Sequence, residues 1–158
     1  MIGDDAGDLP ILKQLGADHL DLPFWAGTRR AEFLLHRCGL CGRHYWPASR
    51  CVTHGDASMA WVPSSGRGTV HTYTILHHAY TAEMAAQVPY CVAVVELEEG
   101  PFFHSNIIGC PMDQIHVGLA VQVRFVVQEG GGLTLPVFTP APAPAPAPAH
   151  DDGRGAGA

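Results

Sequence analysis

Residues 38–54 read CGLCGRHYWPASRCVTH, a stretch that holds four potential metal ligands in two pairs. Cys38 and Cys41 form a CxxC pair, and Cys51 and His54 form a CxxH pair after an interval of nine residues. Two pairs at this spacing let four side chains converge on one ion, and tetrahedral zinc accepts three thiolates and one imidazole. Four protein ligands leave no open position for catalysis. The stretch therefore predicts a rubredoxin-like zinc ribbon with a structural Zn²⁺ site.

Two other histidines compete for the fourth position, because His36 and His44 lie close to the ligand pairs in the sequence. The alternative is that the cysteines are ordinary reduced thiols and His54 a surface residue, or that the site has lost its metal. In a small and polar region, a bound metal replaces the missing hydrophobic core.

Downstream of this stretch the apolar pattern changes to the alternation of β-strands. In residues 120–128 the pattern alternates, which predicts that Val121, Val123, Phe125 and Val127 point inward. The polar residues Gln122, Arg124 and Gln128 are expected to point outward. The segment 110–118 has room for one helical turn between the third and fourth strands. Short strands at this spacing predict a mainly β protein with a five-stranded barrel of the oligonucleotide-binding (OB) type. The expected strands span residues 69–76, 90–97, 102–108, 120–128 and 133–138.

The rest of the chain divides around the ribbon and the barrel. Pro23 favours the first turn of a short helix within residues 21–30, and residues 11–15 could form one or two further helical turns. Alternating Pro and Ala near the end favour an extended chain with no core. We expect an N-terminal helical segment (1–30), a zinc ribbon (31–60), an OB-fold barrel (61–139) and a disordered Pro-Ala tail (140–158).

The charge is unevenly distributed over the 158 residues. The formal net charge is −6, yet residues 29–56 carry +3 while residues 57–139 carry −4. Nucleic-acid binders concentrate Lys and Arg on the binding face, so an acidic barrel argues against a nucleic-acid partner.

The sequence also indicates a compartment. An odd number of cysteines, five, argues against a disulfide framework. The first ten residues are acidic where a signal peptide is basic and then apolar, and no apolar run is long enough to span a membrane. We expect a cytoplasmic protein with no membrane partner.

Five segments carry a resemblance to a known family. The chain resembles the ribbon–OB family of acyl-CoA-associated proteins, long described only as a domain of unknown function, over about residues 20–139. It departs from the family at residue 54, where His stands in place of a fourth Cys. The segments are PFW at 23–25, FLLHRCGLCGRHYWPASRC at 33–51, GRGTVHTYTIL at 66–76, PYCVAVVELEEG at 89–100 and VGLAVQVRF at 117–125.

The resemblance implies a function that composition does not show. Family members act as small partner subunits of thiolase-superfamily enzymes, including thiolases, acyltransferases and retro-aldolases that shorten acyl-CoA side chains such as those of steroids. The resemblance thus implies a hetero-oligomer in which a thiolase-like large subunit is catalytic. The small subunit supports the active-site channel and helps to hold CoA.

Individual residues fit a supporting role better than catalysis. Cys91 and Cys110 are expected in the core, and the pair at 77–78 has no nucleophile at motif spacing, so no catalytic residue is predicted. His104 and Asn106 could face a pocket.

Basic and aromatic residues are the candidates for binding. Arginines can bind CoA phosphates, or instead balance the zinc thiolates. Aromatic residues are enriched at protein interfaces, although any of them can also belong to the core. The predicted CoA-binding residues are Arg29, Arg30, Arg43, Arg50 and Arg67, and the predicted interface residues are Phe24, Trp25, Trp46 and Tyr80.

Two other functions stay open. An OB barrel with a ribbon is also compatible with a single-stranded nucleic-acid-binding protein, which would bind with steep salt dependence. A stand-alone hydrolase or transferase would turn over an acyl-CoA without a partner.

Overall fold

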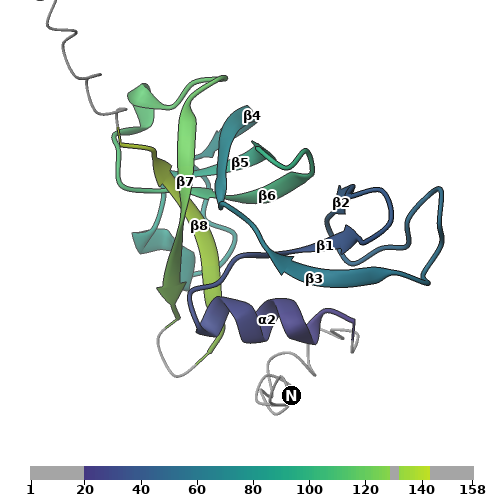
Figure 1. Ribbon diagram of the computed structural model, residues 1–158. Coiled ribbons are helices and arrows are strands. Elements are labelled where there is room, and N and C mark those ends of the chain that lie inside the picture. Colours follow the sequence, from purple (N-terminus) through teal and green to yellow (C-terminus); the bar gives the residue numbers. More distant parts are fainter. Residues whose placement is uncertain (1–19, 129–131, 143–158) are drawn as a thin grey trace, which may run out of the picture.

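The computed structural model describes residues 20–128 and 132–142. Its described part is mainly β, as the sequence predicts, and the helical turns expected over 11–15 lie outside it. Figure 1 shows the single described α-helix, α2 (Leu22–Arg29), beside two sheets. The other elements are β1 (Leu34–Cys38), β2 (His44–Tyr45), β3 (Met59–Pro63), β4 (Arg67–Leu76), β5 (Tyr90–Leu97), β6 (Phe102–Ile107), β7 (Ala120–Val127) and β8 (Thr134–Pro140), with 3₁₀ turns η1 (Glu83–Ala86) and η2 (Met112–Gln114).

The ribbon contains a three-stranded antiparallel sheet in the order β2-β1-β3. Its central strand, β1, ends at Cys38, and the chain turns immediately through the CxxC pair into β2. The boundary expected between residues 60 and 61 falls inside β3, which pairs with β1 up to Pro63. The ribbon sheet therefore continues to the connector at residues 64–66.

The second sheet is a closed barrel in the order β4-β5-β6-β8-β7, which is the strand order of an OB fold. The five predicted strands are confirmed, as is the helical turn in segment 110–118, where η2 lies. β4 closes the barrel by pairing with β5 and, at its start, with β7. At this closure a Cβ on Gly68 would lie 2.4 Å from the carbonyl oxygen of Glu96, so only glycine lets the strands approach.

Two expectations about the barrel end are wrong. Val127 was expected to point inward, but its side chain is 68% exposed. Burial decreases along β7 from Val121, which is buried, towards the end of the strand. Pro140, expected in the tail, instead belongs to β8 and pairs with Val121. Residues 143–158 of the predicted tail lie outside the described residues.

The larger of two hydrophobic clusters among the described residues joins the helix, the ribbon and the barrel. Phe24 of α2 and Leu35 of β1 are fully buried in the same cluster as Phe138 of β8. The centroid of the Phe24 ring lies 4.2 Å from the ring centroid of Trp46 in the ribbon and 6.1 Å from that of Phe103 in the barrel. The three parts therefore form one packed body.

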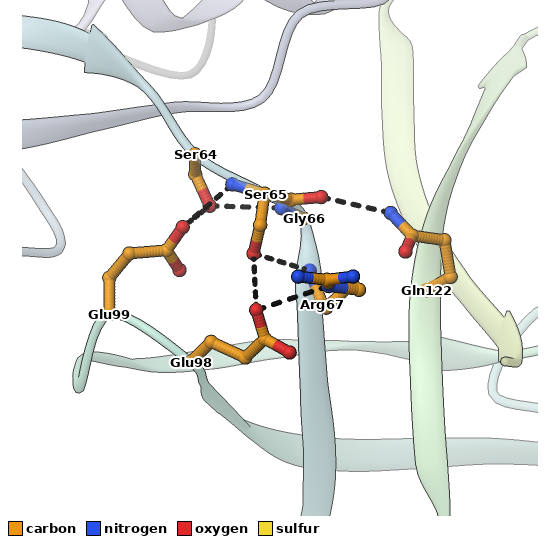
Figure 2. Close-up of polar contacts among 7 residues, drawn as sticks. All are labelled: Ser64, Ser65, Gly66, Arg67, Glu98, Glu99 and Gln122. Atoms are coloured by element: carbon orange, nitrogen blue, oxygen red, sulfur yellow. Dashed lines mark hydrogen bonds and ion pairs between the residues drawn. The ribbon is translucent and has the colours of Figure 1, made fainter. Parts of the chain in front are cut away.

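The connector between ribbon and barrel is held by polar contacts (Figure 2). One carboxylate oxygen of Glu99 accepts hydrogen bonds from the Ser64 hydroxyl at 2.9 Å and the Ser65 N–H at 2.6 Å. The adjacent Glu98 accepts one from the Ser65 hydroxyl at 3.2 Å and pairs with Arg67 at 3.1 Å. The β5–β6 turn thus fixes the connector to the barrel.

Candidate metal centre and surrounding surfaces

The four predicted metal ligands meet at one end of the ribbon. Their ligand atoms all lie within 4.8 Å of one another, and the three cysteines are free thiols. Nδ1 of His54 lies 3.6 Å from Sγ of Cys38 and 3.5 Å from Sγ of Cys51. Sγ of Cys41 lies 3.7 Å from Sγ of Cys51. This cluster can hold a metal ion and is consistent with a zinc ribbon.

The hydrogen bonds of the backbone explain why these side chains converge. In the first knuckle, the Gly42 N–H donates to the Cys38 carbonyl at 2.8 Å, which closes the CxxC turn. In the second, Cys51 and Gly55 exchange two hydrogen bonds, of 3.0 and 2.9 Å, which brings His54 back over Cys51. The competing histidine His36 is engaged elsewhere, because its Nδ1 contacts the backbone of Ser49, at 2.8 Å from the carbonyl oxygen and 3.1 Å from the amide nitrogen.

One contact to the cluster was missed from the sequence. The Tyr45 hydroxyl donates to Sγ of Cys51 at 3.4 Å and accepts the Val52 N–H at 3.3 Å. The Tyr45 hydrogen bond is the largest influence on the pKa of Cys51, and with backbone N–H groups it outweighs burial and lowers that pKa to about 5. The lowered pKa favours the thiolate form of Cys51, which is the form that binds metals.

The five predicted CoA-binding arginines lie on separate elements. Arg29 and Arg30 are at the end of α2, Arg43 and Arg50 are in the ribbon, and Arg67 begins β4. Three of the five have carboxylate partners on the exposed surface: Arg30 pairs with Glu32 at 2.8 Å, Arg50 with Asp56 at 2.7 Å and Arg67 with Glu98 at 3.1 Å. Exposed pairs of this kind are weak because water screens them, so a phosphate can displace the carboxylates at small cost.

The predicted interface residues differ in exposure. The interface role predicted for Phe24 is wrong, because its side chain is fully buried in the core and offers no surface to a partner. Trp25 and Trp46 are half-buried and line a cavity of about 280 Å³ between α2, the ribbon and the barrel. Tyr80 is 70% exposed, in the loop between β4 and β5.

The remaining cysteines are placed for packing. Cys91 is fully buried, and burial raises the pKa of its thiol and that of the half-buried Cys110. Both line a cavity of about 570 Å³. Within residues 20–128 and 132–142, neither thiol hydrogen-bonds to a histidine. Thiols that are protonated and lack a base are poor nucleophiles.

The other polar candidates lack a nucleophile partner as well. The pair at 77–78 is exposed in a loop. His104 and Asn106 do line the aromatic cavity beside α2, and the Asn106 amide donates to the carbonyl of Cys91 at 2.9 Å. This arrangement positions a backbone and does not activate a reacting group.

Glu99 is a second residue that sequence reasoning missed, since Glu96, Glu98 and Glu99 look like a solvated strand end. Burial raises the pKa of Glu99, but hydrogen bonds from Ser65, from its own N–H and from Ser64 outweigh it, so the pKa is lowered. Its other carboxylate oxygen is buried without a partner in the described residues. The side chain therefore serves the ribbon–barrel junction.

Comparison with known proteins assigns the chain to a family. A family model described as the C-terminal OB-fold domain of ChsH2 matches residues 61–126. A DUF35 domain-containing scaffold protein of Methanothermobacter thermautotrophicus is 34% identical over 100 residues, which are 60% of this chain and 73% of that protein. The chain belongs to the DUF35 family. The resemblance read from the sequence is thereby confirmed.

Longer relatives are named as subunits of CoA enzymes. A probable enoyl-CoA hydratase alpha subunit of Thermomonospora curvata is 33% identical over 132 residues, 82% of this chain and 40% of that protein. The 3-oxo-4,17-pregnadiene-20-carboxyl-CoA hydratase alpha subunit of Mycobacterium tuberculosis is 28% identical over 103 residues, 65% of this chain and 32% of that protein. The chain therefore spans well under half the length of these two relatives.

A solved structure matches most of the fold. A chain of the Ltp2-ChsH2(DUF35) aldolase superimposes with a TM-score of 0.69 at 29% sequence identity. The match covers 78% of this chain and 95% of that chain. No helix among the described residues is both long and apolar enough to cross a membrane.

Proposed function

We propose that this chain is the non-catalytic accessory subunit of a thiolase-superfamily acyl-CoA enzyme. The large subunit supplies the reacting groups, and this chain stabilises it and supports its CoA channel. The observation that carries the proposal is the match to a chain of the Ltp2-ChsH2(DUF35) aldolase, which covers 78% of this chain and 95% of that chain. The acyl-CoA class includes bulky side chains such as those of steroids.

The chemistry of the described residues supports a division of labour. Cys91 is fully buried with a raised pKa, and the histidine pair at 77–78 has no acidic or nucleophilic partner among the described residues. Catalysis by a nucleophile requires an activated group within hydrogen-bond reach of its base. The proposal therefore places the catalytic residues on the large subunit.

The metal in this proposal is a structural zinc ion. Around a tetrahedral zinc, Zn–S bonds of about 2.3 Å and Zn–N bonds of about 2.0–2.1 Å give S–S separations of about 3.8 Å and S–N separations of about 3.6 Å. The Sγ atoms of Cys41 and Cys51 are 3.7 Å apart, and His54 Nδ1 lies 3.6 Å from Sγ of Cys38 and 3.5 Å from Sγ of Cys51. All the ligand atoms lie within 4.8 Å of one another. Cys38, Cys41, Cys51 and His54 would hold the ion and fill its coordination, so the zinc cross-links two knuckles.

The predicted contacts to CoA and to the large subunit remain part of the proposal. Arg29, Arg30, Arg50 and Arg67 are candidate phosphate ligands, and Arg43 is a candidate ligand for either a CoA phosphate or a carboxylate of the large subunit. For the partner, the aromatic cavity beside α2 presents Trp25 and Trp46, and the β4–β5 loop presents the exposed Tyr80. Aromatic side chains of this kind commonly anchor interfaces.

A second candidate is an accessory unit of an enoyl-CoA hydratase. Two relatives with hydratase names contain a segment similar to this chain within longer proteins. In that case this chain would have the role of that segment and would pair with a hydratase chain.

Co-expression separates these functions. The full chain is produced together with each thiolase-like and each hydratase-like chain of the same genome, and complexes are resolved by size-exclusion chromatography with mass determination. The proposal expects a stable complex with a thiolase-like chain, and the second candidate expects one with a hydratase chain. Separate elution in every combination would refute both. Tight binding of a single-stranded oligonucleotide at physiological salt would favour the nucleic-acid-binding alternative instead.

A further inference from the structure

The end of the ribbon that carries the metal cluster also carries exposed apolar side chains. Leu40 is 65% exposed and Val52 is 76% exposed. Each is adjacent in sequence to one of the cysteines, Cys41 and Cys51, whose sulfurs lie 3.7 Å apart. The two aliphatic side chains therefore stand on neighbouring knuckles. Figure 1 shows this end of the ribbon projecting away from the barrel, where a second protein can reach it.

Holding a metal does not require these two side chains. The knuckle geometry comes from backbone hydrogen bonds and the ligands, and the apolar residues of the ribbon that face the core, Leu34 and Leu35, lie on β1. Polar residues at positions 40 and 52 would leave the cluster intact and would be better solvated. Adjacent exposed apolar residues on a small surface mark an interaction site more often than single ones do.

Two arginines close in sequence to the first knuckle have no carboxylate partner among the described residues. Arg50 is paired with Asp56 at 2.7 Å, whereas Arg37 and Arg43 have no carboxylate within ion-pair distance in the described part of the chain. The Arg37 guanidinium lies beside the first knuckle, 3.3 Å from the position that a Cβ on Gly42 would take. We call the surface formed by Leu40, Val52, Arg37 and Arg43 the knuckle tip.

We infer that the knuckle tip is a docking surface for the large catalytic subunit, an inference that rests on the proposed function. It fits a partner surface with an apolar hollow bordered by carboxylates. Residues 29–56 carry +3 with the cysteines counted as neutral, and they stay net positive with Zn²⁺ bound by three thiolates. The field of the ribbon therefore attracts an acidic surface that the barrel segment, at −4, repels. The partner's hollow would cover the two aliphatic side chains, and its carboxylates would pair with the two arginines.

A nucleic acid fits the same surface less well. Single-stranded binding combines a basic groove with exposed aromatic rings on which bases stack. At this end of the ribbon, the exposed apolar side chains are aliphatic, and Tyr45 and Trp46 are half-buried. Two unpaired arginines also give only a small number of phosphate contacts.

The test measures the dissociation constant of the complex with the large subunit, using the full chain with its metal bound. The double variant Leu40→Asp/Val52→Asp should raise Kd about 100-fold, because it places charge in an apolar contact. The double variant Arg37→Glu/Arg43→Glu should raise Kd about 10-fold and weaken its salt dependence. The matched control is Val117→Asp/Val127→Asp, at valines that are 63% and 68% exposed on the barrel, and it should leave Kd unchanged.

Metal content and melting temperature, measured on each variant, keep the result interpretable. The inference is supported if metal content and melting temperature stay unchanged in every variant and only the knuckle-tip variants bind the large subunit more weakly. If wild type and Leu40→Asp/Val52→Asp have the same Kd, the inference is wrong but the proposed function stands. The same conclusion follows if only the barrel control loses binding. If oligonucleotide binding depends on the two arginines and the complex does not, the surface is a nucleic-acid site and the inference is wrong. Absence of any wild-type complex refutes the proposed function and the inference together.

Discussion

Replacing Phe24 by alanine should destabilise the whole protein, because this ring joins three parts of the fold. Phe24 is fully buried. Its ring centroid lies 4.2 Å from the ring centroid of Trp46, 5.2 Å from that of Trp25 and 5.8 Å from that of Phe33. A fully buried Phe→Ala change costs about 3–5 kcal/mol. That loss is a large share of the about 5–15 kcal/mol by which domains are stable, and it corresponds to a fall of about 10–20 °C in melting temperature.

Urea unfolding followed by tryptophan fluorescence is a direct assay, because Trp46 and Trp61 pack against the same core. The matched control is Phe102→Ala, at a phenylalanine that is 45% exposed, and it should cost about 1 kcal/mol or less. If the two variants lose equal stability, or if Phe24→Ala loses less than about 1 kcal/mol, the shared core described above is refuted.

Three further predictions concern the cluster and the connector. Tyr45→Phe removes the hydroxyl that donates to Cys51 at 3.4 Å, so zinc affinity should fall about 10–100-fold in a chelator competition, and an unchanged affinity would contradict the role given to the hydroxyl. Stripping the metal with a strong chelator, or replacing Cys51 by alanine, should lower the melting temperature and expose the ribbon to protease. The control variant Cys91→Ala should retain one metal per chain. Substoichiometric zinc in carefully purified wild type would argue against a structural site. Because the pKa of Glu99 is lowered in the folded protein, its contribution to stability is complete above the ordinary carboxyl pKa of 4.5 and is lost as the pH falls through the lower folded value. Unfolding titrations from about pH 5 to about pH 3 should therefore show a steeper loss for wild type than for Glu99→Gln, and parallel curves would contradict the assignment.

The convergence of three cysteines and one histidine and the barrel strands were predictable because each depends on local pattern. CxxC and CxxH spacing is a property of short knuckles, and the alternation of β7 and the valine-rich run of β5 are properties of single strands. The structure places His54 with the three cysteines, although the spacing alone left His36 as a competitor. That choice depended on the contact between His36 and Ser49, which is 13 residues away in the sequence.

Features that depend on distant contacts were beyond the sequence. An eight-residue helix with an aromatic pair does not reveal which ring is buried, and only the packing of α2 against ribbon and barrel makes Phe24 a core residue. Glu99 reaches Ser64 across 35 residues, so its role in the connector has no local signal. The only sign of the Tyr45 contact was a hydroxyl-bearing residue between the two ligand pairs.

Acyl-CoA turnover by the large subunit, measured with and without this chain, tests the central claim most directly. The thiolase-like chain and the full accessory chain are purified separately, mixed in increasing ratio and assayed for cleavage or transfer of the acyl-CoA. We expect activity that neither chain shows alone and that saturates at a fixed stoichiometry of the two chains. Full activity of the large chain by itself, or turnover by this chain alone, would contradict the assignment of a non-catalytic accessory subunit.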